Sequence, residues 1–279
     1  MECLQLSNRI KEEFLQKSEP VRLNKYLSEA GVCSRREADR LIETGRVTVD
    51  GQRAQTGMRI VPGQVVKVGN KVVSKQDEMI VLAVNKPRGI VCTEERRERD
   101  SIVRFLNYPV RVTYIGRLDK DSHGLLLMTN NGDIINKMMR AANKHEKEYK
   151  VTVDKEITED FLKKMASGVP ILDTVTRPCT VKKIGKYTFS IILTQGLNRQ
   201  IRRMCEALGY EVKDLLRVRV MNITLDGLKD GQYRKLTDQE LNELYDQLKD
   251  SSALPGGKYQ EQWVATQDNR TRHGKGKKR

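Results

Sequence analysis

Two short amphipathic helices are predicted near the start of the chain by the spacing of its apolar residues. Apolar side chains over 23–30 recur at i, i+3, i+4 and i+7, and Gly31 follows as a residue that can end a helix. Ser34 and Glu37 then stand at capping-box spacing before a second apolar stripe over 38–42. The pattern indicates two helices joined by a tight turn.

Strand-like and helix-like segments alternate without a regular order through the rest of the chain. VTVDG at 47–51 alternates and ends in an Asp-Gly pair, which is typical of a β-hairpin. Later strands are predicted within 79–93, 125–130, 145–154 and 187–193, and helices within 130–140, 157–168 and 201–209. This order favours an α+β fold with a mixed, largely antiparallel sheet and flanking helices.

The 279 residues exceed the usual size of one hydrophobic core, so two folded units are expected. We predict a flexible lead-in at 1–19, a small domain at 20–78 and a larger domain at 79–250. From residue 251 to 279 the composition becomes rich in Gly, Ser and basic residues, which predicts a basic disordered tail.

The net charge of the chain indicates what kind of partner the protein binds. The chain has 52 Lys and Arg against 37 Asp and Glu, and the formal net charge of +15 suits a polyanion such as nucleic acid. A cationic membrane protein is disfavoured because there is no run of about 18 apolar residues. The first residues also lack a signal-peptide core, so a cytoplasmic location is expected.

The number and spacing of the cysteines and histidines argue against a metal site. The five cysteines are scattered and never form a CxxC pair, which argues against a zinc ribbon or a disulfide framework. The three histidines would need carboxylate partners that no spacing suggests. No metal and no cofactor are therefore expected.

Basic residues crowd the predicted small domain, where they either bind phosphates or form a solvated face. The stretch RLNKYLSEAGVCSRREADRLIETGRVTVDG resembles the S-four RNA-binding domain in both helices and in the turn. The resemblance implies that this unit docks on structured RNA. The candidate RNA-binding residues are Arg22, Lys25, Arg35, Arg36, Arg40 and Arg46.

Three later stretches contain more polar and ionisable residues than their predicted local structure needs: GRLDKDSHGLL, KEYKV and QGLNRQIRRM. Taken singly, the first is typical of a surface turn, and the tyrosine of the second is typical of a core residue. The arginines of the third are typical of phosphate ligands. Together, in this order and spacing, they resemble the pseudouridine synthases of the ribosomal small-subunit pseudouridine synthase A type, whose members carry an S-four domain before the catalytic domain.

The resemblance covers nearly all of residues 20–250 and implies a cofactor-independent enzyme that isomerises a specific uridine in RNA to pseudouridine. The chain is most similar to the subgroup that acts on 23S ribosomal RNA, and members of that subgroup also accept a transfer RNA anticodon stem-loop. A monomer is expected, because no long heptad pattern suggests a coiled-coil dimer.

The same resemblance implies the roles of individual residues. Asp119 is the expected catalytic carboxylate, acting as nucleophile or as base toward the ribose, and Arg202 is expected to keep it ionised. Tyr149 is expected to lie against the uracil, and Arg117 to fill the space that the flipped-out base leaves. Leu125 and Ile201 are expected to wall the pocket. Further substrate contacts are expected from Asn198, Arg199, Gln200 and Arg203.

Other functions stay open at this point. Asp119 and Asp121 raise a glycosidase alternative, but the paired carboxylates of glycosidases lie across the scissile bond, about 5 to 9.5 Å apart, which neighbours on one turn seldom achieve. Asp121 is therefore expected to be a turn former. A noncatalytic RNA-binding ribosome-assembly factor and an RNA glycosylase that releases uracil are the remaining alternatives.

Overall fold

The computed structural model describes residues 20–74, 79–95 and 97–251. The predicted lead-in at 1–19 lies outside the described residues, and so does the predicted tail apart from Ser251. Among the described helices, none has the length and apolar character needed to cross a membrane.

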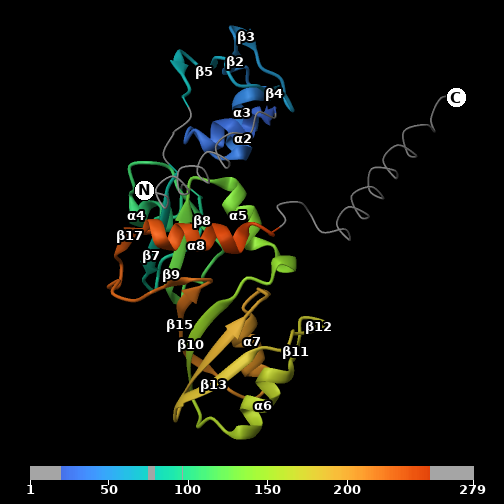
Figure 1. Cartoon of the computed structure of the whole chain (residues 1–279), viewed down its shortest axis with the longest axis vertical. Helices are drawn as coiled ribbons and strands as arrows, with labels where there is room; N and C mark the ends of the chain where they lie inside the picture. The colour runs from blue at the N-terminus through green and yellow to red at the C-terminus, as the bar shows by residue number, and fades with distance from the viewer. Residues whose placement is uncertain (1–19, 75–78, 96, 252–279) are drawn as a thin grey trace, which may run out of the picture.

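The small unit at the start of the described chain, blue in Figure 1, has its own hydrophobic core cluster. Its second helix begins where predicted, because the Ser34 hydroxyl accepts the Glu37 backbone N–H at 3.2 Å. The predicted hairpin turns at Asp50 and Gly51, which both have positive φ, 50° and 81°. The unit consists of β1 (Val21–Arg22), α2 (Leu23–Glu29), α3 (Arg35–Glu43), β2 (Val47–Val49), β3 (Gln52–Arg53), β4 (Arg59–Ile60), β5 (Val66–Val68) and β6 (Lys71–Val72).

A nine-stranded mixed sheet forms the centre of the larger unit in the described residues. Its main order is β13-β14-β10-β15-β9-β7-β17, with β16 beside β15 and β8 beside β9. All these pairings are antiparallel except β9 with β15, which confirms the predicted fold class. The strands are β7 (Val81–Lys86), β8 (Thr113–Ile115), β9 (His123–Thr129), β10 (Lys147–Val153), β13 (Thr180–Gly185), β14 (Thr188–Leu193), β15 (Val212–Val220), β16 (Ile223–Thr224) and β17 (Tyr233–Lys235).

Helices cover both faces of this sheet. In β7, Val81 and Ala83 join one core cluster while Leu82 and Val84 join another, as the alternation of a strand buried on both faces requires. The predicted helix at 130–140 is present as α5, with Ile134 and Met138 buried and Met139 48% exposed. The helices are α4 (Ile102–Leu106), α5 (Gly132–Met139), the 3₁₀ turn η1 (Ala141–Asn143), α6 (Glu159–Ser167), α7 (Gln200–Ala207) and α8 (Asp238–Leu248); a hairpin of β11 (Pro170–Ile171) and β12 (Thr174–Val175) lies between α6 and β13.

The pairing of β9 with β15 joins the two halves of the sheet through two residue pairs, His123 with Leu216 and Gly124 with Arg217. Gly124 has a φ of +101°, which a residue with a side chain rarely adopts. A Cβ atom there would lie 2.4 Å from the backbone oxygen of Arg217. The close approach of the two strands therefore requires glycine at position 124.

Replacing Gly124 by alanine should weaken this junction. We expect Gly124→Ala to lower the free energy of unfolding by about 2 to 4 kcal/mol, because a backbone clash adds to the cost of a positive φ. Gly63→Ala is the matched control, since Gly63 has a φ of +94° and a Cβ atom there would meet no other atom within 4 Å. Urea unfolding measures both, and an equal loss in the two variants would contradict the clash at the junction.

Candidate active site

The charged stretch GRLDKDSHG folds into a turn that leads into β9. The Ser122 N–H donates to the Asp119 carbonyl at 3.1 Å, and the Gly89 N–H donates to the Lys120 carbonyl at 2.8 Å. Leu118 is buried, and its N–H donates to Cys92 Sγ at 3.5 Å. With Leu118 anchored inside, Arg117 is exposed and the Asp119 side chain is 38% exposed.

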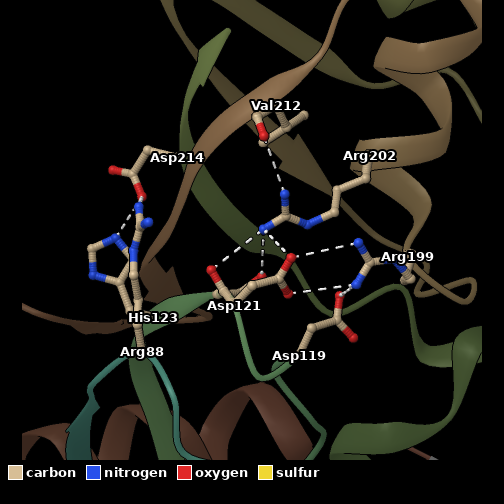
Figure 2. A network of polar contacts seen from close by, with 9 residues as sticks. Arg88, Asp119, Asp121, His123, Arg199, Arg202, Val212 and Asp214 are labelled. Carbon is tan, nitrogen blue, oxygen red and sulfur yellow. Dashed lines mark hydrogen bonds and ion pairs between the residues drawn. The ribbon is translucent and has the colours of Figure 1, made fainter.

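Two arginines from the start of α7 face this turn (Figure 2). Arg199, the N-cap residue of α7, lies in the left-handed region with a φ of 49°. Its guanidinium is 3.5 Å from Asp119 Oδ2 and 3.5 Å from each carboxylate oxygen of Asp121. Arg202, one turn further along, is 3.2 Å from Asp121 Oδ2. Charges of alternating sign thus run from Asp119 to Arg202.

The expected pairing of Arg202 with Asp119 is not the arrangement found. Arg202 is anchored by Asp121 and by Ser122 Oγ at 3.3 Å, while Nη1 donates to the Val212 carbonyl at 3.3 Å. These contacts hold Arg202 over the β9–β15 junction, so the guanidinium beside Asp119 is that of Arg199. Asp121 lies in the turn, as expected, and in addition binds both arginines.

The charge of Asp121 is set by these neighbours. Partial burial acts to raise its pKa, but the charge of Arg202 and the hydrogen bonds from Arg199 outweigh burial and hold the pKa below its usual value. Asp121 is therefore ionised at neutral pH and can keep both guanidinium groups in place.

Tyr149 reaches the same region from the other half of the sheet. On β10 it lies opposite Ile191 of β14 and opposite Arg217 of β15. Its side chain is half-buried and packs against the core clusters on both sides of the sheet junction. The strand predicted within 145–154 is confirmed, and Val151 and Val153 are buried as in a strand with one face on the core.

The structure separates the expected substrate-binding residues into two groups. Arg117, Asn198 and Arg199 are exposed, whereas Ile201 and Gln200 are buried. The Gln200 amide oxygen accepts the Leu197 N–H at 3.0 Å and so closes the loop before α7. Arg203 is partly buried and folds back on the Asn198 carbonyl, with Nε donating at 3.1 Å.

Leu125 does not wall this site, which corrects the sequence-based expectation. Its side chain is fully buried in the core cluster that contains Leu127 and residues of α5 and α8. Because strand side chains alternate, Leu125 points to the face opposite that of Gly124. Only the backbone of Leu125 acts near the site, because its carbonyl oxygen accepts the Nε–H of Arg217 at 2.6 Å.

A second polar cluster beside the turn was missed by the sequence analysis. Asp214, near the start of β15, is 2.8 Å from His123 Nε2 and forms an ion pair with Arg88 (Figure 2). Partial burial acts to raise the pKa of Asp214, but the hydrogen bonds and charges of His123 and Arg88 lower it overall. Arg88 and Asp214 are 126 positions apart in the sequence, so no local sequence pattern could have predicted that these side chains meet.

The basic residues predicted to bind RNA differ in their surroundings. Lys25 is 2.8 Å from Asp133 at the start of α5 and 3.4 Å from Glu29, so it links the small unit to the larger one. Arg40 pairs with Glu37 at 3.2 Å on the surface of α3. The exposed members of the set are Arg22, Arg35, Arg36, Arg40 and Arg46.

A hollow of about 590 Å³ lies elsewhere, between η1, the end of α8 and β15. Its lining includes His145, Glu146 and Arg219, and none of the residues around Asp119 contributes to it. We therefore locate the candidate site by its side-chain chemistry, at the turn before β9, rather than by this hollow.

Comparison with known proteins finds two matching families. A family profile described as RNA pseudouridylate synthase matches residues 80–207, and a profile described as S4 domain matches residues 21–66. The first range contains Asp119, Tyr149 and the α7 arginines.

Individual relatives are similar over most of the chain. The Dual-specificity RNA pseudouridine synthase RluF of Escherichia coli (strain K12) is 56% identical over 84% of this chain and 81% of its own length. The Ribosomal large subunit pseudouridine synthase B of Bacillus subtilis (strain 168) is 35% identical over 80% of this chain and 95% of its own length. A crystal structure of pseudouridylate synthase superposes with a TM-score of 0.60 at 27% identity, covering 80% of this chain and 99% of the other.

The ion pair between Arg202 and Asp121 predicts a pH-dependent contribution to stability. Because the pKa of Asp121 is lowered in the folded protein, the contribution is present above the unfolded pKa of about 4 and is lost as the pH falls through the folded value. We expect Arg202→Met to raise the pKa of Asp121, measured by carbon-13 NMR of the carboxyl groups. Lys164→Met, which removes the partner of the remote Asp160, is the control that should leave Asp121 unchanged. An unchanged Asp121 pKa in Arg202→Met would contradict the assigned pairing.

Proposed function

This chain belongs to the RNA pseudouridylate synthase family, and on that premise we propose that Asp119 begins the isomerisation, that Tyr149 and Arg202 assist it, and that the modified RNA is 23S ribosomal RNA. The protein is an RNA pseudouridine synthase with an S4 domain ahead of its catalytic domain. We propose domain limits of 20–78 and 79–250.

The observation that carries the catalytic proposal is the ion-pair chain from Asp119 to Arg202. Converting uridine to pseudouridine breaks the bond between ribose C1′ and uracil N1 and rejoins C1′ to C5. This change needs no oxidant and no energy source, but it needs a carboxylate that reaches the sugar as nucleophile or base. Asp119 is partly exposed in the turn before β9, beside the guanidinium of Arg199.

Arg202 supports Asp119 indirectly in this arrangement. Its side chain is 15% exposed and is fixed by Asp121, Ser122 and Val212. Through Asp121 it positions Arg199, and binding of RNA phosphates can redistribute the two guanidinium groups toward Asp119. The residue is therefore proposed as a positioning group in the free enzyme.

Tyr149 and Arg117 are proposed to handle the base. Tyr149 offers an aromatic face for the uracil and a hydroxyl for proton movement after C5 has bonded to C1′. Arg117 is exposed immediately before Asp119, where it can enter the space that the flipped nucleotide leaves. The turn that precedes β9 and the register of β10 support these two proposed roles.

The RNA proposal rests on the relatives and on charge. The relative from Escherichia coli is named as a dual-specificity enzyme, and we propose that this chain likewise accepts a second substrate, a transfer RNA anticodon stem-loop. Exposed arginines on α3 and the net charge of +15 suit the phosphates of a structured RNA. The protein is proposed to act as a monomer in the cytoplasm, without a cofactor.

Replacing Asp119 tests the assignment. We expect Asp119→Asn to slow pseudouridine formation by more than about a thousand-fold, because no carboxylate then reaches the sugar. Carbodiimide treatment and primer extension on unmodified large-subunit ribosomal RNA detect the product, and a filter-binding assay checks that RNA affinity is retained. Asp160→Asn, an exposed carboxylate on α6, is the matched control and should keep wild-type activity.

The possible outcomes separate the alternatives. A new stop with wild type and none with Asp119→Asn supports both the reaction and the role of Asp119. Equal stops with both proteins contradict that role, and an abasic ribose in place of pseudouridine identifies a glycosylase. If the ribosomal RNA gives no stop, transfer RNA is the next substrate, and no product on either RNA contradicts the proposed substrates.

A further inference from the structure

Two basic side chains are buried beneath the active site. Lys86, the last residue of β7, is 0% exposed, and Arg217, in the middle of β15, is 2% exposed. Neither was singled out by the sequence analysis. Burial of a cation is costly, so each requires a structural or functional reason.

Neither cation has a carboxylate partner among the ion pairs of the described residues. Lys86 Nζ donates to the carbonyls of Pro87 and Ile90, both at 2.8 Å. Arg217 donates through Nε to the Leu125 carbonyl at 2.6 Å, and its buried Nη2 has no hydrogen-bond partner. The positive charges are therefore solvated by carbonyl dipoles and are not neutralised locally.

Strand register places both cations in one row with Tyr149. Lys86 lies opposite Gly124, Gly124 opposite Arg217, and Arg217 opposite Tyr149, across four neighbouring strands (Figure 1). Side chains of directly opposed residues project from the same face of a sheet. Since Gly124 has no side chain, the row consists of Lys86, an open position, Arg217 and Tyr149.

The same row lies under the turn that carries Asp119. The loop that Lys86 closes contains Gly89, whose N–H donates to the Lys120 carbonyl at 2.8 Å. Burial outweighs the other influences and lowers the pKa of Lys86 overall, although Cys92, Asp121 and Asp119 act to raise it; Arg217 also acts to lower it. The two carboxylates and Arg217 are thus close enough to act on Lys86 through their electric fields.

The reaction produces the charge that such a row can stabilise. When the C1′–N1 bond breaks, its electron pair leaves with N1, and the uracil becomes an anion with charge spread over N1 and its two carbonyl oxygens. Asp119 meanwhile bonds to C1′ or removes the ribose C2′ proton. When C5 bonds to C1′, the bond or proton is returned, C5 loses its hydrogen as a proton and N1 gains one, so no electrons are gained or lost overall.

We propose that Lys86 and Arg217 form a positively charged floor below Tyr149 that stabilises the uracil anion during this cleavage. The proposal rests on the proposed roles of Asp119 and Tyr149. Both groups are positioning residues, because they act through their charge at a distance and not through contact with the reacting atoms. Preorganised charge in a dry site stabilises a developing anion without reorganisation.

A merely structural role for the two cations would give a different kinetic result. Fluorine at C5 withdraws electrons and makes the departing uracil a weaker base, so its anion needs less stabilisation by the protein. Loss of the floor should therefore slow a uridine substrate more than a 5-fluorouridine substrate. A loosened fold should slow both substrates by the same factor.

The experiment measures single-turnover loss of the target nucleoside in two otherwise identical RNAs, with uridine or 5-fluorouridine at the modified position, by nuclease digestion and mass spectrometry. We expect Arg217→Met and Lys86→Met each to slow the uridine RNA by about 100-fold, in the range for loss of one preorganised donor, and the fluorinated RNA by about 10-fold or less. Arg217→Lys, which keeps the charge, should restore most of the rate on uridine. Arg219→Met is the control on the same strand, because Arg219 is ion-paired with Glu146 and Glu148 and lies outside the row.

Equal slowing of both RNAs by the two neutralising variants overturns the proposal, and so does failure of Arg217→Lys to exceed Arg217→Met. If Arg217→Met does not fold, as judged by circular dichroism and RNA binding, Lys86→Met and Arg217→Lys still decide the outcome. Wild-type activity on the uridine RNA is measured first, so a wrong RNA substrate is distinguished from a wrong role for the cations. Stronger slowing of the fluorinated RNA also contradicts the proposal.

Discussion

The short parallel pairing of β9 with β15 is the constraint on which the active site depends. It joins two halves of the sheet through two residue pairs, and the site takes side chains from both halves. Asp119 comes from the turn before β9, whereas Tyr149 and the α7 arginines come from the other side. Gly124 permits the close approach, and the ion pairs of Asp214 and Asp121 cross the same junction. A displacement of the two strands here would separate the Asp119 carboxylate from Tyr149.

Positive and negative side chains are distributed unequally around this junction. Above the sheet, Asp119 and Asp121 face Arg199 and Arg202 in a partly exposed network whose interactions are screened by water. Within the sheet, buried cations are solvated by backbone carbonyls. In the proposed placement of the uracil, the carboxylate lies on the sugar side and the positive charge on the ring side. This polarity matches a reaction in which the electron pair of the glycosidic bond moves into the ring.

The S4 domain is connected to this machinery through charged contacts at α2. Lys25 binds Asp133 at the start of α5, and Arg111 contacts Ser28 at 3.4 Å. Such polar contacts can be exchanged for RNA phosphates more readily than an apolar interface can. The arginines of α3 are exposed on the same domain, where the proposed RNA contacts would form.

The sequence by itself determined the two helices and the hairpin of the first unit, the α+β class, and the turn that carries Asp119, because local spacing, capping and resemblance all act over short stretches. It also placed Tyr149 within a predicted strand. Only the tertiary structure decided that Arg199 lies beside Asp119 while Arg202 pairs with Asp121, and that Leu125 faces away from the site. It alone brought Arg88, His123 and Asp214 together and aligned Lys86 with Arg217. These relations depend on which strands are neighbours and in what register, and contacts between residues about 80 to 130 positions apart leave no local pattern in a single sequence.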